Sequence, residues 1–286
     1  MAMARVRDTF NRLSPFQRFY LIAVGALIIG PFAPLIIQSL AFRWAWPDLL
    51  PSVWWFEQRE RSPIPLAWDY VLSPYSRVWE ATVNTLVIGL AVTFICLAIC
   101  LPAARVLAWE RFRGKSSFEF FLSLPLIVPE AAIGIALLMI FIRLGLAGSY
   151  VGIIIAHLIP TIPYMVRMLT AVYQGLGREF EEQAMTLGAN RWQVLRMVTL
   201  PMLMPGVIAG ALFTFLVSSN IFLLTFFLGQ GQIITLPTLL FSKISGGTLD
   251  ASAAGITLIV SLPGIILLII SERFIKEEAF GKGFGS

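Results

Sequence analysis

Long stretches without charge divide this chain of 286 residues. A helix that crosses the hydrocarbon core of a bilayer needs roughly 20 consecutive apolar residues. Stretches of about that length or longer, free of Asp, Glu, Lys and Arg or broken only by Glu130, recur along the sequence. They predict six membrane spans, near residues 19–41, 82–104, 119–142, 150–171, 202–227 and 251–271.

The longest uncharged stretch, residues 197–242, is more than twice as long as one span requires. Its second half contains GQGQIITLP, and glycine and proline favour turns. We therefore expect one span followed by an uncharged hairpin. Elsewhere, Cys96 and Cys100 lie four residues apart on one face of a predicted span. We expect them to be small packing residues, because no disulfide framework or zinc spacing is present.

The composition agrees with a membrane location. Hydrophobic residues make up 58% of the chain and charged residues 13%, whereas soluble domains carry about 25% charged residues. So little polar surface cannot cover a water-soluble globule. We predict an all-α membrane protein, and the first uncharged stretch is too long for a signal peptide, so we expect it to be a retained span.

Lys and Arg are concentrated on one predicted side of the membrane. Fifteen of the 21 lie in four regions that six spans would place together. The positive-inside rule puts these regions, and both termini, in the cytoplasm. The basic residues are scattered at span ends, so we expect no nucleic-acid partner. The predicted parts are a cytoplasmic tail (1–18), a transmembrane domain (19–272) with an external loop (43–80) and a cytoplasmic loop (178–201), and a second cytoplasmic tail (273–286).

The external loop is rich in tryptophan and proline, as in RWAWPDLLPSVWWFEQ. Tryptophan favours the headgroup zone of a bilayer. We expect this loop to anchor along the outer surface, and contact with a periplasmic partner is the alternative.

A charged, amphipathic segment interrupts the apolar pattern in the middle of the chain: FEEQAMTLGANRWQVLRMVTLP, residues 180–201. We predict a helix over 180–187 with an acidic first turn, which complements the helix dipole. Gly188 follows, where a C-terminal cap favours positive φ. A second short helix is expected over 190–199, with Pro201 ending it and opening the next span.

Three interpretations of this helix pair are open from the pattern alone. It could be a connector on the membrane surface, a helix-turn-helix that reads DNA, or a docking element for a cytoplasmic partner. The acidic first helix and the short tethers on both sides argue against DNA.

The segment resembles the EAA loop of binding-protein-dependent ABC importer permeases. That loop has Glu-Ala-Ala, three residues, Gly, nine residues, an aliphatic residue, one residue and Leu-Pro. Gln183 departs from the pattern by replacing the first alanine, and the matching residues here are Glu182, Ala184, Gly188, Val198, Leu200 and Pro201. RFRGK, SLPLIVPEAAIGIALL and AHLIPTIPYMVRMLTAVYQGL extend the resemblance to the second permease of spermidine/putrescine-type importers, from about residue 82 to 272.

The resemblance implies a MetI-like fold of six spans with a cytoplasmic coupling helix pair, located in the bacterial inner membrane. It implies two ATPase subunits, a second, different permease chain and a periplasmic solute-binding protein as partners. This chain would then be a transport subunit without a cofactor or metal, and would not itself be an enzyme. The residues it implies for ATPase coupling are Glu182, Ala184, Gly188, Trp192, Leu195, Leu200 and Pro201.

Polar residues inside predicted spans are costly and are candidates for function. For Asn84 we weigh a ligand contact against a helix–helix hydrogen bond, and for Glu130 a structural or gating role. We expect His157 to be a packing residue. Ser219 and Asn220 lie at the depth of a pathway, where polyamine permeases tend to be acidic. This neutral pair leaves amino-acid-like, opine-like, phosphonate and other anionic solutes as candidates beside polyamines.

Other classes of protein fit the sequence less well. The chain has no Walker A, HExxH or GxSxG pattern and a single histidine, which disfavours a membrane-embedded enzyme. A self-contained secondary transporter or channel is the main alternative. Such carriers often show inverted repeats, and no repeat relates the two halves of this chain.

Overall fold

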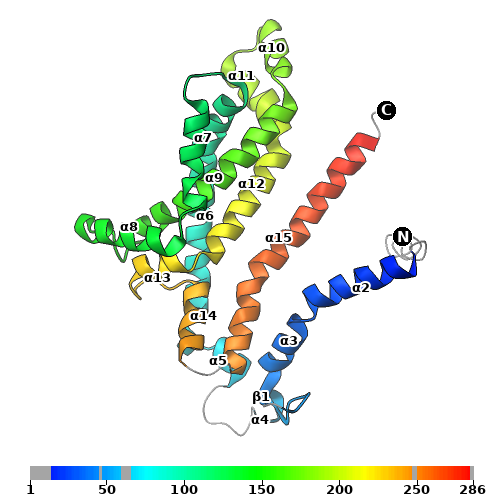
Figure 1. The fold of residues 1–286 in the computed structure, drawn as a ribbon, viewed down its shortest axis with the longest axis vertical. Helices are drawn as coiled ribbons and strands as arrows, with labels where there is room; N and C mark the ends of the chain where they lie inside the picture. The colour runs from blue at the N-terminus through cyan, green and yellow to red at the C-terminus, as the bar shows by residue number, and fades with distance from the viewer. Residues whose placement is uncertain (1–13, 45–46, 59–65, 247–249, 284–286) are drawn as a thin grey trace. The chain divides into compact units, whose positions relative to one another are not determined.

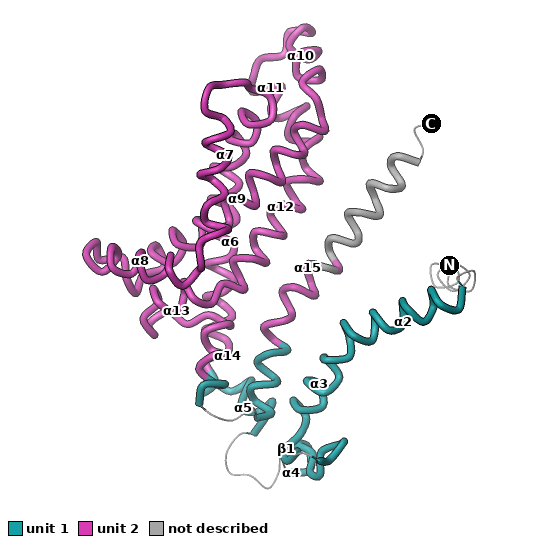
Figure 2. Tube along the Cα trace, viewed as in Figure 1, with its two compact units in different colours: residues 1–76, 243–258 teal, residues 77–242, 259–286 magenta. Residues whose placement is uncertain are grey.

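The computed structural model of the chain describes residues 14–44, 47–58, 66–246 and 250–283 (Figure 1). Towards the C-terminus, the structure describes side chains up to residue 267 and at residue 269. The chain forms two compact units (Figure 2). The first comprises residues 1–76 and 243–258, and the second comprises residues 77–242 and 259–286.

The first unit begins with an apolar helix whose start is fixed by Ser14. The Ser14 hydroxyl accepts from the Gln17 amide, and the Gln17 side chain accepts from the Ser14 amide, a reciprocal capping box. The elements of this unit up to residue 76 are α2 (Pro15–Ile29), α3 (Phe32–Leu40), the antiparallel strands β1 (Ala41–Arg43) and β2 (Val53–Trp54), α4 (Trp55–Gln58), α5 (Ala67–Val71) and η1 (Pro74–Ser76).

The Trp-rich segment that was expected to be an external loop forms part of this unit. The Trp55 indole donates to the Asp69 carboxylate at 3.2 Å. The Lys243 ammonium lies 3.9 Å from the centre of the Tyr70 ring, a cation–π contact. These contacts tie short elements together, and the expectation that the segment anchors at a membrane interface stays a prediction.

The second unit is built around three long helices, α6 (Val78–Trp109), α9 (Tyr150–Leu176) and α12 (Leu200–Asn220), which pack against one another (Figure 1). Shorter elements join them: α7 (Lys115–Ser123), η2 (Leu124–Leu126), α8 (Glu130–Leu144), α10 (Glu179–Thr186), α11 (Arg191–Val194), η3 (Leu195–Thr199) and α13 (Leu223–Gly229). Two further helices, α14 (Leu236–Ser245) and α15 (Ala251–Gly283), each begin in one unit and end in the other.

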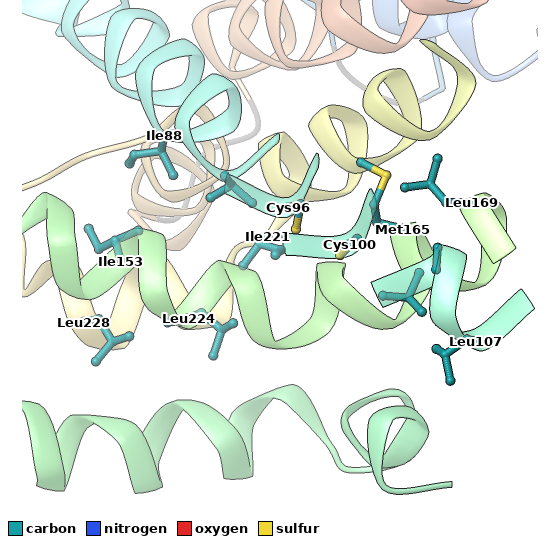
Figure 3. Packing of buried hydrophobic residues seen from close by; sticks show 14 of the residues in the cluster. Ile88, Cys96, Cys100, Leu107, Ile153, Met165, Leu169, Ile221, Leu224 and Leu228 are labelled. Atoms are coloured by element: carbon teal, nitrogen blue, oxygen red, sulfur yellow. The ribbon is translucent and has the colours of Figure 1, made fainter. Parts of the chain in front are cut away.

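Small residues allow these three helices to approach closely. Cys96 and Cys100 on α6 are fully buried in the apolar core, as Figure 3 shows, which confirms them as packing residues. A Cβ placed on Gly210 of α12 would lie 2.9 Å from the sulfur of Met165, and one on Gly206 would overlap the side chain of Val172. Gly206 and Gly210 therefore mark a close contact between α12 and α9.

Within the part of the chain that the structure describes, four helical segments are long and apolar enough to cross a membrane: residues 15–40, 78–109, 150–176 and 191–220. A fifth candidate consists of residues 115–126 and 130–144 with a bend of 94° between them, and the apolar part of α15, Ala251–Leu267, is shorter. These candidates are compatible with six spans, whose number stays a prediction.

Two predicted span boundaries are wrong. The expected span over 119–142 is broken before Glu130, in a segment that contains Pro125 and Pro129. The expected span over 202–227 ends at Asn220, and α13 follows as a separate helix after a break at Ile221 and Phe222. At the other end of the chain, α15 continues to Gly283, and the expected cytoplasmic tail over 273–286 stays a prediction.

Candidate coupling site and pathway

The central segment forms a short helix and a glycine turn at one end of the second unit (Figure 1). Helix α10 has three glutamates in its first turn. The helix ends at Thr186, and Gly188 follows with a φ of +89° and an N–H···O bond of 3.0 Å to the Met185 carbonyl. No atom lies within 4 Å of a Cβ placed on Gly188. Glycine is therefore favoured there by backbone conformation and not by space, as the sequence predicted.

The second half of the segment differs from the prediction. Asn190 caps α11 through a capping box with Gln193. Helix α11 then continues through the π-helical turn η3 into α12, so that Arg191–Asn220 is one helix. The expectation that Pro201 separates a short helix from a span is wrong. Pro201 has no N–H for the carbonyl of Met197, and a wider π turn accommodates it without ending the helix.

Glu181 joins this segment to the spans, and the sequence analysis did not single it out. Its side chain is 7% exposed. One carboxylate oxygen accepts from the Arg105 guanidinium of α6 at 2.5 Å, and the other accepts from the Thr199 hydroxyl of η3 at 2.6 Å. Three separate elements therefore meet at one carboxylate.

The surroundings of Glu181 keep its carboxyl ionised. Burial raises the pKa of Glu181, but the hydrogen bonds from Arg105 and Thr199 lower it by more, so the net pKa lies below the usual value of 4.5. Charge-assisted hydrogen bonds of this kind are stronger than neutral ones. At neutral pH the Glu181 carboxylate is therefore ionised and able to accept both hydrogen bonds.

The helical spacing of residues in α10 places Glu181 on a different face from Glu179 and Glu182, and this spacing could have identified it. Five residues on one face of α10 line a shallow surface depression: Glu179, Glu182, Gln183, Thr186 and Leu187. Glu181 and Met185 lie on the opposite face and line a cavity beside α6. Of the three neighbouring glutamates, only Glu181 points toward the spans.

The residues expected to couple to an ATPase are divided between surface and interior. Glu182 is exposed and pairs with Arg178 at 3.3 Å within the same segment. Trp192 is 67% exposed. Pro201 is also exposed, and the partly buried members of the set are Ala184, Leu195 and Leu200.

The four residues expected along a pathway do not form one cluster of free polar groups. Asn84 is buried and joins three parts of the second unit. Its amide donates to the Ile234 carbonyl at 2.8 Å and accepts from the Tyr150 hydroxyl at 2.6 Å. Asn220 is exposed and donates to the carbonyl of Leu216 on its own helix at 2.8 Å.

Glu130 has a partner within the chain. It is the first residue of α8, and its carboxylate accepts from the Leu224 amide at 3.2 Å, at the start of α13. The contact gives Glu130 a structural role, one of the alternatives for this residue. Ser219 differs from both Glu130 and Asn84. Its hydroxyl is buried and, within the described residues, has no hydrogen-bond partner.

His157 is a fully satisfied buried residue. Its two ring nitrogens lie 3.0 Å from the Ser218 hydroxyl and 2.9 Å from the Thr225 hydroxyl. This confirms the expectation of a packing role. The contacts also bridge the break between α12 and α13.

Comparisons with known proteins agree with this architecture. Residues 100–277 match the family described as binding-protein-dependent transport system inner membrane component. The putrescine transport system permease protein PotI of Escherichia coli (strain K12) is 31% identical over 194 residues, which cover 66% of this chain and 69% of that protein. The molybdenum transport system permease protein ModB of the same strain is 30% identical over 224 residues, covering 70% and 96%.

A solved structure resembles the fold over nearly its whole length. A chain in the crystal structure of a bacterial ABC transporter involved in the import of the acidic polysaccharide alginate superimposes with a TM-score of 0.67. The match covers 91% of this chain and 98% of that chain at 20% sequence identity. At that identity the likeness concerns the fold alone.

Proposed function

Since the chain belongs to the family of binding-protein-dependent transport system inner membrane components, we propose that residues 178–201 are the element through which a separate ATPase drives it. The chain is an inner-membrane permease subunit of an ABC importer with a MetI-like fold. ATP hydrolysis is performed by another subunit, and a binding protein is a further partner. Family membership overturns the alternative of a self-contained secondary transporter or channel.

The observation that carries the coupling proposal is the position of Glu181. The exposed face of α10, with Glu182 and Leu187, is free to meet a cytoplasmic subunit. The opposite face is held through Glu181 to Arg105 of α6 and Thr199 of η3. A displacement of α10 by the ATPase is thereby passed to two long helices of the second unit.

The other residues expected to couple to the ATPase have different roles in this proposal. Glu182 and Trp192 form the surface that meets the ATPase. Gly188 sets the angle between α10 and α11. Ala184 and Leu195 pack beneath that surface, and Leu200 and Pro201 lie in the continuous helix that receives the motion.

We place the solute pathway beside Ser219 and Asn220, the two candidates whose polar side-chain groups form no hydrogen bond to another described element. Glu130 already accepts from Leu224 and Asn84 already bridges Ile234 and Tyr150. With neutral groups at 219 and 220, a small anionic or zwitterionic solute fits better than a polyamine. The relatives named for putrescine and for molybdenum make polyamine and oxyanion uptake the first pair to compare.

The assembly we propose has two ATPase copies and a second, different permease chain. Both termini and residues 178–201 face the cytoplasm. The parts are then a cytoplasmic tail over 1–18, a transmembrane domain over 19–272 and a cytoplasmic tail over 273–286.

Reconstitution tests this function. The permease complex is purified with its ATPase and placed in vesicles with its binding protein, and uptake of putrescine and of molybdate is followed with and without ATP. ATP-dependent uptake that disappears when the ATPase subunit is omitted supports the proposal. Uptake by the permease alone, without ATP, contradicts it.

A further inference from the structure

A cavity of about 650 Å³ lies between the bundle-facing side of α10 and the end of α6. This volume falls within the range of about 300–1,000 Å³ that small-molecule sites occupy. All of its lining residues belong to the second unit. We propose that this cavity binds the headgroup of an anionic phospholipid, an inference that rests on the proposed cytoplasmic position of residues 178–201.

The charges around the cavity favour an anion. Three guanidinium groups and two carboxylates line it. Arg105 is paired with Glu181, and Arg178 is paired with Glu110 at 3.3 Å. Arg191 has no ion pair with any described residue, which leaves one positive charge and a set of N–H donors facing the cavity.

Guanidinium groups match the geometry of a phosphate. The planar fork of arginine presents paired N–H donors to two phosphate oxygens at once. Arg191 is the first residue of α11, and Arg178 directly precedes α10. A phosphate between them would contact both halves of the coupling segment.

The apolar part of the lining distinguishes a lipid from a soluble anion. Leu101 and Pro102 of α6 and Leu195 of η3 line the cavity beside the arginines. Leu101 and Pro102 lie in the last third of α6, where this span approaches the membrane–water boundary. Such a combination of apolar and basic surface at a helix end suits the glycerol and headgroup regions of a phospholipid.

The test compares two arginines that are five positions apart. The complete transporter is reconstituted in nanodiscs of phosphatidylcholine with phosphatidylglycerol, and the lipid retained after extraction into detergent is measured by native mass spectrometry. Arg191→Gln removes the unpaired charge of the cavity. Arg196→Gln removes another exposed charge, one that does not line the cavity.

We expect Arg191→Gln to lower phosphatidylglycerol retention about tenfold, the loss of one charge-assisted contact, and Arg196→Gln to leave it unchanged. Equal retention by the two variants would overturn the proposal. Protection of α10 and α11 from hydrogen exchange by inorganic phosphate or glycerol 3-phosphate, in nanodiscs of phosphatidylcholine alone, would also overturn it by identifying a soluble-anion site.

ATPase co-purification is scored in the same preparations. Loss of ATPase from the wild-type complex contradicts the proposed function, whereas unchanged lipid retention in Arg191→Gln contradicts the lipid site. The two failures are therefore distinguishable.

Discussion

Glu181 and Glu182 are adjacent in sequence and have opposite environments. Glu182 is largely exposed and pairs within its own segment, whereas Glu181 is buried and joins α10 to α6 and η3. The family pattern directs attention to Glu182. Arg105, the partner of Glu181 on α6, is 76 residues away in sequence, and no local pattern identifies this pair.

The contribution of Glu181 to stability depends on pH in a defined direction. Its pKa is lowered in the folded protein, so the stabilisation is present above the unfolded-state value and is lost as pH falls through the folded-state value. We expect the free-energy difference between wild type and Glu181→Gln to be constant near neutral pH and to shrink below about pH 4.5. Thermal unfolding across a pH series measures it. A difference that grows toward acid pH would show that the carboxylate is not stabilised by these contacts.

Gly188 offers a second prediction at the level of one residue. Gly188→Ala forces a Cβ into the left-handed region at a cost of about 1–2 kcal/mol, although no atom obstructs it. Gly175→Ala, in the last turns of α9 and equally unobstructed, places alanine in a helix and serves as control. Circular dichroism melts should show lower stability for the first variant only. Equal melting temperatures would mean that the turn relaxes without cost.

At the scale of elements, the sequence identified what depends on local chemistry. The turn at Gly188 follows from the backbone conformation that glycine favours, and it is present. Hydropathy could not show where an uncharged helix breaks, so the end of α12 at Asn220 was missed. The His157 contacts to Ser218 and Thr225, made in three dimensions, bridge that break.

Proline accompanies a helix break at one place and lies within a continuous helix at another, and the sequence alone did not distinguish the two. Pro125 and Pro129 accompany the break before α8, with a bend of 94° between the flanking helices. Pro201 lies within a continuous helix because η3 widens the preceding turn. Which outcome occurs depends on neighbours that can satisfy the freed backbone groups.

The contact between α9 and α12 yields a prediction about a pair of residues. Gly206→Ala brings a Cβ against Val172 and should lower stability by about 1–3 kcal/mol, the usual cost of overpacking. Val172→Ala opens space at the same place, so the double variant should recover most of the loss. Denaturation of the two single variants and the double variant in detergent measures this coupling. Additive losses would contradict the contact.

For the whole molecule, the proposed function gives separate roles to separate surfaces. In that proposal the outer face of α10 meets the ATPase, Glu181 passes movement to α6 and α12, and the solute moves near Ser219 and Asn220. The sequence predicted the class of protein, which the family match confirms, and the coupling role of residues 178–201 stays a prediction. It could not show the junction at Glu181, because that junction requires three elements to be packed together.

The most direct test of this account is the number of ATP molecules hydrolysed per solute imported by the reconstituted complex. Glu181→Gln removes the charge from the junction, and Glu179→Gln changes an exposed glutamate of the same turn as a control. The exchanged pair Glu181→Arg with Arg105→Glu tests whether the ion pair itself is what matters. The account predicts that the Glu181→Gln complex keeps its ATPase subunit but hydrolyses at least about tenfold more ATP per solute, a loss in the range of typical coupling energies. Glu179→Gln should behave as wild type. The exchanged pair should recover part of the loss. Wild-type stoichiometry in Glu181→Gln would contradict it.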